Sequence, residues 1–355
     1  MARRRLFVLL LAAPGGTAGG PETATITSGV LFNDTAGAPV HAHGAGVVPP
    51  GDHPSGRAGQ YFIVGTSQKM PPSWLSDSVN LYSSTDLQHW SFEAEIFHSS
   101  QITTPWQPTP EPYRMERPKI LYNQKTSKYV MWFHLDDAAF SMGMVGVATA
   151  DTIRGPYTYA SGWRPDGEWS GDMGLYEEAD KSSAYLVRSV NNQYAGFSRL
   201  TPDYMNTTAA GVISKGPRCE GQAVWKAANG SYWLLGSHLT GWHANEAILA
   251  RSDSPALEGA TWTVVGNPSH SLTTYDSQST YVLPVRTPKG KLLLYMGDRW
   301  NEGSESAPGS VGGASYIWLP MLHNRSDPTG YSMPILGGQW NGTGRWRISD
   351  YLLPD

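Results

Sequence analysis

The chain has 355 residues, of which 40% are hydrophobic and only 16% are charged, and its net charge is −4. This length allows a substantial core in one large domain or two. The slight negative charge, without a basic block, argues against binding to nucleic acid or to an anionic membrane surface. With 39 Gly, 26 Pro, 14 Trp and 18 Tyr, the composition favours many short strands and turns over helices.

The first twenty residues are typical of a secretory signal. Residues 3–5 are arginines, residues 6–13 are apolar, and mainly small residues follow up to position 20. An apolar run this short does not cross a bilayer comfortably. We therefore predict a signal peptide over residues 1–20 and a secreted protein, with Golgi retention by an uncleaved segment as the alternative. Five Asn-x-Ser/Thr sequons favour a secretory glycoprotein and begin at Asn33, Asn206, Asn229, Asn324 and Asn341.

Five short apolar runs recur along the rest of the chain, each after a polar turn. They begin at Tyr61, Tyr129, Tyr185, Tyr232 and Leu292, at spacings of 68, 56, 47 and 60 residues. A second repeat follows the first, in which a strand-like segment leads through a polar turn to an aromatic residue. Irregular repeats of this length indicate a β-propeller with unequal blades, and a β-sandwich or β-helix is the competing interpretation. We predict an all-β protein with a five-bladed β-propeller domain over residues 25–355.

One polar, mostly ionisable residue lies 12 to 18 positions ahead of each run, namely His43, Glu116, Asp172, Glu220 and Gln278. The first strand of each propeller blade lines the central channel, so these side chains are expected to converge. Burial of several carboxylates together is unfavourable, because each raises the pKa of its neighbours. The regular spacing therefore favours an active site over a surface ion pair between Glu116 and Arg117 or Arg114.

Two carboxylic groups that flank a sugar bond are the requirement for glycoside hydrolysis, one to protonate the leaving oxygen and one to activate water. Glu220 lies among small and apolar residues, an environment that raises the pKa of a general acid. The position expected for the base holds Gln278, whose neutral amide is a poor base. Unusual catalysis by the glutamine, a positioning role and an inactive protein are the three explanations.

Eight segments between residues 39 and 348 carry a recognisable pattern. They include His-Ala-His-Gly-Ala-Gly at 41–46, Glu-Arg-Pro-Lys-Ile-Leu-Tyr-Asn at 116–123, Thr-Gly-Trp-His-Ala-Asn-Glu-Ala at 240–247 and Ser-Gln-Ser-Thr at 277–280. The others are 79–87, 128–137, 172–173 and 297–301. In these segments the chain resembles glycoside hydrolase family 43, and within it the group of exo-β-1,3-galactanases and galactan 1,3-β-galactosidases. Ser-Gln-Ser-Thr is particular to this group.

The resemblance implies a five-bladed propeller and an inverting, exo-acting hydrolase that releases galactose from β-1,3-galactan, the backbone of arabinogalactan. It implies that Glu220 is the general acid. It also implies that Gln278 takes the base position through its imidic-acid tautomer, and that Glu116 orients and tunes the pair. Asp172 and Thr240 are expected to hold the terminal galactose. Further substrate contacts are predicted in the matching segments, at His43, Trp242, Asn245, Asp298, Arg299 and Trp300.

Three positions depart from the family pattern. Thr66 stands where a glutamate is usual, Phe140 where a tyrosine is usual, and Gly171 where an arginine is usual. In addition, Arg218 lies one position further from Glu220 than the family's arginine does. Each lost polar contact near the terminal sugar weakens binding by about 1–3 kcal/mol. The departures therefore leave the exact substrate and the level of activity open.

Asp276 raises a separate question, because it lies two residues before Gln278 and residues at this spacing share one face of a strand. One hypothesis is that Asp276 polarises Gln278 or supplies the base itself. The alternative is that strand twist places Asp276 at the rim of the channel, in solvent.

Two other functions remain as alternatives. One is another family 43 activity on arabinose- or xylose-containing glycans, against which Gln278 argues because those enzymes use an aspartate base in the first blade. The other is a non-catalytic galactan-binding propeller. The expected partner is a polysaccharide or oligosaccharide substrate, with no nucleic acid and no transmembrane span, and we expect a monomer.

No cofactor is expected. His41 and His43 are too few to specify a metal site, and although some family members hold calcium, no oxygen-rich loop here requires it. Cys219 is the only cysteine, which excludes an intramolecular disulfide, and we expect its thiol to be packed rather than reactive.

Overall fold

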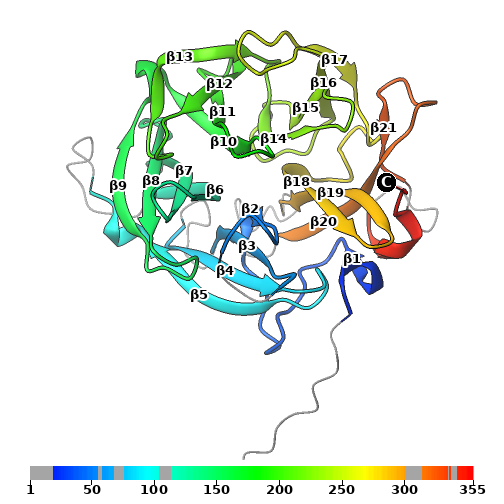
Figure 1. The fold of residues 1–355 in the computed structure, drawn as a ribbon. Helices are drawn as coiled ribbons and strands as arrows, with labels where there is room; N and C mark the ends of the chain where they lie inside the picture. The colour runs from blue at the N-terminus through cyan, green and yellow to red at the C-terminus, as the bar shows by residue number, and fades with distance from the viewer. Residues whose placement is uncertain are drawn as a thin grey trace, which may run out of the picture.

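The computed structural model describes residues 19–54, 58–67, 76–103, 113–300, 314–334, 336 and 342–354. Within them, five four-stranded antiparallel sheets surround a common axis as five blades (Figure 1). The predicted all-β, five-bladed β-propeller is therefore confirmed. Residues 1–18 of the predicted signal sequence and the sequon at Asn341 lie outside the described residues.

The blades follow one another in chain order. Blade one contains β2 (His43–Val48), β3 (Tyr61–Thr66), β4 (Ser78–Ser84) and β5 (Ser91–His98). Blade two contains β6 (Arg114–Asn123), β7 (Lys128–Asp136), β8 (Met144–Ala150) and β9 (Thr158–Trp163). Blade three contains β10 (Ser170–Glu177), β11 (Ala184–Val190), β12 (Tyr194–Leu200) and β13 (Thr207–Lys215).

Blade four contains β14 (Glu220–Lys226), β15 (Tyr232–Ser237), β16 (Ala247–Ser252) and β17 (Thr263–Gly266). Blade five contains β18 (Gln278–Thr287), β19 (Gly290–Arg299), β20 (Ser315–His323) and β21 (Tyr331–Ser332). In Figure 1 the first strands β2, β6, β10, β14 and β18 lie nearest the axis, whereas β5, β9, β13 and β17 lie at the periphery.

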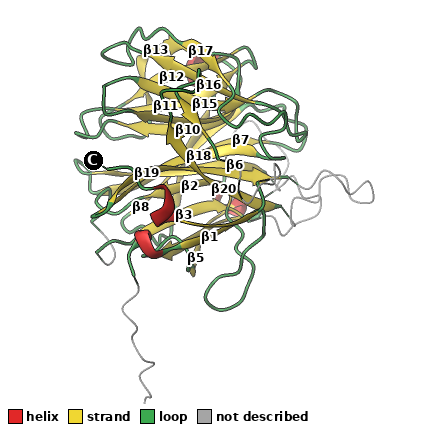
Figure 2. Cartoon of the chain, turned by 90° about the vertical axis from the view of Figure 1, so that its right-hand side faces the viewer, coloured by secondary structure: helices red, strands yellow, loops and turns green. Residues whose placement is uncertain are grey.

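Strands make up the body of the molecule, and the helical turns among the described residues are short (Figure 2). These turns are η1 (Pro21–Thr23), η2 (Ser99–Gln101), η3 (Pro165–Gly167) and η5 (Ile348–Tyr351). None of the helices described is long and apolar enough to cross a membrane.

The two ends of the chain meet in an additional small sheet. β1 (Thr25–Ser28) pairs antiparallel with β22 (Gly344–Arg347), and a bridge between Val30 and Tyr316 ties the segment after β1 to blade five. Ile26 and Trp346 of this sheet are buried. The N-terminal and C-terminal segments thus close the propeller by pairing with each other in a separate sheet. Each of the five blades is built from strands that are consecutive in the chain.

The apolar runs recognised in the sequence are the second strands of the blades. β3, β11 and β15 are buried along their whole length. Each second strand has a hydrogen-bonded strand on both sides, and its two faces pack within the layers between blades. Such strands are continuously apolar because neither face meets water. The outer strand β5 instead contains several exposed and half-buried residues, since it lies at the periphery of its blade.

Candidate active site

Each first strand is irregular at its start. The register shifts between His43 and Gly46 in β2, between Glu116 and Lys119 in β6, between Ser170 and Met173 in β10, between Glu220 and Ala223 in β14, and between Ser279 and Tyr281 in β18. β-Bulges of this kind redirect side chains. The five polar residues predicted from the repeats all lie at or next to these bulges, at the axial ends of their strands.

The bulges in β2, β6 and β14 place one residue in the left-handed region, directly after the polar residue. These residues are Gly44 in β2 (φ 62°), Arg117 in β6 (φ 52°) and Gly221 in β14 (φ 61°). Glycine adopts this conformation without strain, whereas an arginine adopts it at a cost of about 1–2 kcal/mol. The conformation at Arg117 is maintained by the ion pair and hydrogen bonds that its guanidinium makes.

The Arg117 guanidinium joins three blades. Its Nε lies 2.6 Å from Oδ2 of Asp172 in blade three. Its Nη2 donates to Oε1 of Gln278 at 2.6 Å, and its Nη1 donates to the Ser279 carbonyl oxygen at 3.0 Å, both in blade five. Asp172 also accepts a hydrogen bond from the Gly221 backbone N–H, so its carboxylate is fixed from two sides. Arg117 thereby places the candidate sugar-binding Asp172 and the candidate base Gln278 next to each other.

The side-chain amide of Gln278 has a defined orientation. Its Oε1 accepts hydrogen bonds from Arg117 Nη2 at 2.6 Å and from the Trp300 indole Nε1 at 3.0 Å. Its Nε2 donates to the Ser237 hydroxyl at 3.0 Å. Guanidinium and indole N–H groups are donors only, so a flipped amide would oppose donor to donor. The amide oxygen is therefore fully used by the protein, and Nε2 carries the one N–H that remains for a substrate or water.

Glu220 opens β14 and is opposite Ser237 of β15. Burial and, after it, the nearby charge of Asp172 raise the pKa of Glu220 to about 8, against the opposing effect of Arg117. Most Glu220 side chains are therefore neutral at pH 7 and hold a proton that can be donated. Cys219, directly before Glu220, is buried, and burial raises the pKa of its thiol.

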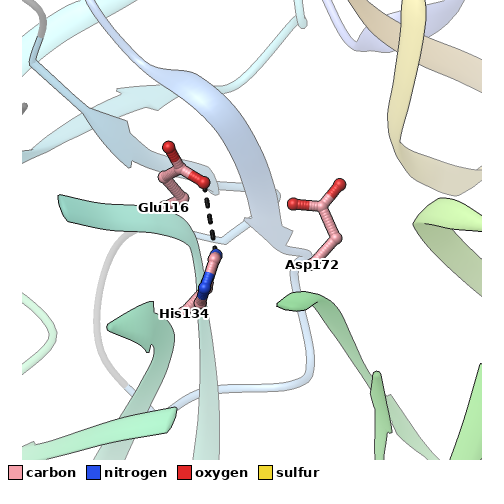
Figure 3. Close-up of side chains that lie close together, drawn as sticks. All are labelled: Glu116, His134 and Asp172. Carbon is pink, nitrogen blue, oxygen red and sulfur yellow. Dashed lines mark hydrogen bonds and ion pairs between the residues drawn. The ribbon is translucent and has the colours of Figure 1, made fainter. Parts of the chain in front are cut away.

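Glu116 lies beside His134 and faces Asp172 across the site (Figure 3). Glu116 Oε2 is 3.2 Å from His134 Nδ1, and His134 Nε2 is 3.2 Å from Asp136 Oδ2. Arg114 Nη1 is 3.8 Å from the other oxygen of Glu116. The alternative of a surface ion pair with Arg117 or Arg114 differs from this arrangement, because Arg117 turns to Asp172 and the pair between Glu116 and Arg114 lies in the interior.

Glu116, His134 and Asp172 offer ligand atoms within 4.8 Å of one another, which is a spacing compatible with a metal ion. Both imidazole nitrogens are already directed at carboxylates, and Asp172 binds Arg117 and the Gly221 N–H. Metal binding would have to break these contacts. The arrangement is better described as a network of ion pairs.

His43 and Asp298 contact each other in the interior. His43 Nδ1 lies 3.1 Å from Asp298 Oδ1, and the Gly44 N–H donates to Asp298 Oδ2 at 2.7 Å. The imidazole stacks on Tyr316 at 5.2 Å between ring centroids. Thr66, one of the departures from the family pattern, is buried opposite His43 and donates its hydroxyl to the His43 carbonyl. These side chains connect blade one to blade five.

The loop between β15 and β16 holds three of the predicted substrate residues. Asn245 Nδ2 donates to Thr240 Oγ1 at 2.6 Å, and Thr240 Oγ1 donates to the His243 carbonyl at 2.6 Å. Trp242 packs edge-on against Trp300 at 4.9 Å between centroids. Since Trp300 donates to Gln278, this aromatic contact brings the loop to the site.

Arg299 supports the backbone ahead of β18. Its Nη2 donates to the Tyr275 carbonyl at 2.8 Å and its Nη1 to Thr343 Oγ1 at 3.1 Å. Tyr275 and Asp276 both have φ of 58°, and β18 begins only at Gln278. Asp276 is therefore not on the strand, and it is exposed. The expectation that Asp276 shares a strand face with Gln278 is wrong, because the left-handed turn ends the alternation of side chains before the strand begins.

An aromatic pair borders the acidic cluster where two departures from the family pattern occur. Phe140, with 39% of its surface exposed, stacks on His134 at 6.4 Å, and Trp169 packs edge-on against His134 at 6.2 Å. The Trp169 indole donates to the Phe140 carbonyl at 3.3 Å. A Cβ atom at Gly171 would lie 2.7 Å from the Trp169 ring, and one at Gly143 would lie 1.9 Å from it. Both glycines leave room for the indole.

Sequence reasoning assigned no role to several residues of the site. Asp136 and His134 hold Glu116, Ser237 contacts Gln278, and Lys119 donates Nζ to the Gly44 carbonyl at 2.9 Å. His134 and Asp136 lie two positions apart on a predicted strand, a spacing that places both on one face. The other two carried no signal, because their contacts come from different blades.

The fold is similar to those of solved glycoside hydrolases. The exo-β-1,3-galactanase of Phanerochaete chrysosporium, solved with galactose, is 32% identical with a TM-score of 0.74, and the match covers 88% of this chain and 67% of that one. The exo-β-1,3-galactanase 1,3Gal43A of Clostridium thermocellum is 31% identical with a TM-score of 0.74 and coverage of 88% and 65%. The GH43 β-1,3-galactosidase BT0265 is 30% identical with a TM-score of 0.76 and coverage of 93% and 64%.

The chain thus spans about two thirds of the length of these relatives. No protein-family model and no curated protein matches it. The structural matches nevertheless combine identity of 30% or more with coverage of most of the chain. The chain belongs to glycoside hydrolase family 43, among the exo-β-1,3-galactanases and β-1,3-galactosidases, and is a glycoside hydrolase.

Proposed function

We propose that the protein is an exo-acting, inverting hydrolase that releases galactose from β-1,3-galactan. The observation that carries the proposal is the pairing of a carboxylic acid that is largely neutral at pH 7, Glu220, with the oriented amide of Gln278 on the neighbouring first strand. The relatives support the choice of sugar, since the Phanerochaete enzyme was solved with galactose and its variants with β-1,3-galactotriose.

In this mechanism Glu220 donates its proton to the glycosidic oxygen while that oxygen's bond to the anomeric carbon breaks. A water attacks the same carbon from the opposite face and loses a proton, which inverts the configuration. The hydrogen bonds to Gln278 Oε1 from Arg117 and Trp300 stabilise negative charge on that oxygen. They therefore favour the imidate form of the side chain, in which Nε2 has released one of its two protons to solvent and holds a free electron pair. This nitrogen then accepts the proton from water, which restores the amide.

Asp172 and Glu116 complete the proposed roles. Asp172 is held by Arg117 and the Gly221 N–H, and it presents a fixed carboxylate to a sugar hydroxyl. Glu116 faces it from blade two and orients the substrate and Glu220. Thr240, Trp242 and Asn245 contribute from the loop that meets Trp300.

The proposal is tested with Glu220→Gln on β-1,3-galactan. The variant should release galactose at least ~10²-fold more slowly than the wild type, because the general acid is lost. Glu258→Gln, which changes a half-exposed glutamate paired with Arg199, is the matched control and should retain wild-type release. NMR of the first product should show the inverted anomer.

Equal release by Glu220→Gln and wild type would refute the assignment of the acid. Binding of galactan without release by the wild type would identify a binding propeller, and release from arabinose- or xylose-containing glycans alone would identify another family 43 activity.

We also propose that the protein is a secretory glycoprotein. The sequon residues Asn33, Asn206 and Asn229 are exposed outside the blade strands and are accessible for glycosylation. Expression in a eukaryotic secretory host should give a mass that falls on treatment with an N-glycosidase. A mass equal to that of the bare chain would contradict glycosylation, and retention inside the cell would favour the Golgi alternative.

A further inference from the structure

His134 has a carboxylate at each of its two ring nitrogens. Nδ1 lies 3.2 Å from Glu116 Oε2 and Nε2 lies 3.2 Å from Asp136 Oδ2. A neutral imidazole carries one N–H and can donate to only one of these partners. The side chain is 2% exposed, so water does not replace a missing hydrogen bond. Both contacts are satisfied together only when the ring is an imidazolium.

Asp136 is the fixed end of this chain of contacts. Its Oδ1 accepts from the backbone N–H groups of Asp137 at 2.9 Å and Met142 at 2.8 Å, and its Oδ2 accepts from Gly143 at 3.1 Å. With His134, the two oxygens face four donors, and a proton on either oxygen would point at one of them. The Asp136 carboxylate is therefore fixed in its orientation in the interior, with Oδ2 facing His134.

Glu116, at the other end of this chain of contacts, is held by fewer hydrogen bonds than Asp136. Its Oε2 accepts from His134, whereas its buried Oε1 has no hydrogen-bond partner among the described residues. Figure 3 shows the first oxygen turned toward His134 and the second turned away from the ring. The cation nearest to Oε1 is Arg114, whose Nη1 lies 3.8 Å away. Glu116 is thus held between the His134 imidazole at one oxygen and the Arg114 guanidinium at the other.

The charges around His134 come from several strands. They are Glu116, Arg114 and Arg117 on β6, Asp136 on β7, Asp172 on β10 and Glu220 on β14. Burial lowers the pKa of His134, but the hydrogen bonds and charges of Asp136 and Glu116 outweigh burial and raise the pKa to about 10. The imidazolium is thus present throughout the neutral range.

We propose that His134, anchored by Asp136, is a positioning residue that remains an imidazolium and holds the Glu116 carboxylate in place beside Asp172. The inference rests on the proposed function for what Glu116 contacts, but the charge state of His134 stands independently of it. Burial raises the pKa of the general acid Glu220, the charges of Asp172 and Glu116 add to the rise, and Arg117 and the His134 imidazolium oppose it.

The charge state is tested without substrate, by NMR of protein labelled with ¹⁵N in histidine. One imidazole should have protons on both ring nitrogens and keep both of them up to pH 9. Its signals should be missing from the spectrum of His134→Gln, which assigns them to His134. In Glu116→Gln the same ring should lose a proton at lower pH, because one carboxylate is gone. The exposed histidines of each sample provide the reference. If every histidine loses a ring proton below pH 8, His134 does not remain an imidazolium and the proposed charge state is wrong.

The positioning role is tested by steady-state kinetics on β-1,3-galactan. His134→Gln should lower kcat at least ~10-fold with a smaller change in KM, because Glu116 is misdirected in the reacting complex. His270→Gln removes a partly exposed histidine bound to a single carboxylate, Asp327, and should leave kcat unchanged. If His134→Gln does not fold, Asp136→Asn, which removes the charge that anchors the ring at Nε2, serves in its place and should also lower kcat.

The outcomes are distinguishable. A wild-type kcat in His134→Gln, with the imidazolium confirmed by NMR, would overturn the positioning role and leave the proposed function standing. A wild-type protein that releases no galactose would refute the proposed function, whatever the NMR shows.

Discussion

Arg117 Nη2 donates a hydrogen bond of 2.6 Å to Oε1 of Gln278, and this contact fixes which atom of the glutamine is free. Gln278 lies on blade five and Arg117 on blade two. A neutral amide becomes a plausible proton acceptor only if charge on its oxygen is stabilised, and a buried guanidinium provides this stabilisation. In the proposed mechanism, the ability of Gln278 to act as the base therefore depends on Arg117 as well.

The indole of Trp300 should contribute to this stabilisation. Trp300→Phe removes one donor to Gln278 Oε1 while Arg117 keeps the other. We expect kcat to fall roughly 5-fold, the equivalent of about 1 kcal/mol for one neutral hydrogen bond. Initial rates on β-1,3-galactan measure the effect.

The control for Trp300→Phe is Trp262→Phe, which removes a comparable indole hydrogen bond to Ser214, between blades three and four and away from Gln278. Equal kcat in Trp300→Phe and wild type would mean that the contact does not assist the amide in the reaction.

The pH dependence should report Glu220. A general acid must be protonated, and the pKa of Glu220 is raised to about 8, first by burial and then by Asp172. The value of kcat/KM should therefore be retained through neutral pH and fall about tenfold per unit above pH 8. A pH–rate profile of the wild type tests this, and the alkaline limb should be absent from the residual activity of Glu220→Gln. A decline that begins near pH 5 would indicate that Glu220 is ionised and is not the acid.

A glycine at position 171 should be needed to leave room for the indole ring of Trp169. A methyl group at position 171 would lie 2.7 Å from the indole ring, so Gly171→Ala forces the ring to move. We expect a loss of about 1–3 kcal/mol in the free energy of unfolding, measured by urea denaturation.

A double-mutant cycle separates this clash from other effects of the methyl group. In a Trp169→Ala background the same Gly171→Ala change should cost less, because the clash is gone. An equal cost in both backgrounds would show that the ring is not the reason for glycine at this position.

Asp276 should be dispensable. It is exposed and lies in a left-handed turn before β18. Asp276→Asn should keep kcat/KM within about 2-fold of wild type, whereas Gln278→Ala in the same assay should lose at least ~10²-fold. A large loss in Asp276→Asn would restore Asp276 as a candidate base.

The thiol of Cys219 should be inert in the folded protein. It is 1% exposed, and burial, followed by the charges of Glu220 and Asp172, raises its pKa. A thiolate-specific reagent at pH 8 should label no cysteine in the native protein and one in denaturant, since the chain has a single cysteine. Rapid labelling of the native protein would show that the segment before Glu220 opens to solvent.

Several features were predictable from the sequence because they are local. Apolar runs such as 232–235 are the second strands, which are buried on both faces and so are continuously hydrophobic. The polar residue ahead of each run marks the start of a first strand, and this placed Glu116, Asp172, Glu220 and Gln278 around one axis. The repeat spacing thus predicted the five blades, and the segments around Gln278 indicated the family.

Only the tertiary structure decided which of these groups are connected. Bulges and positive φ angles turn Arg117 toward Asp172 and Gln278, and they turn Asp276 away from the strand face expected for it. His134 receives carboxylates from β6 and β7, and Gly171 makes room for a ring from its own blade. The sequence by itself determined the strands and the residue types at the axis, because periodicity reflects local burial. The partners, orientations and protonation states depended on backbone irregularities and contacts between blades, which no local pattern encodes.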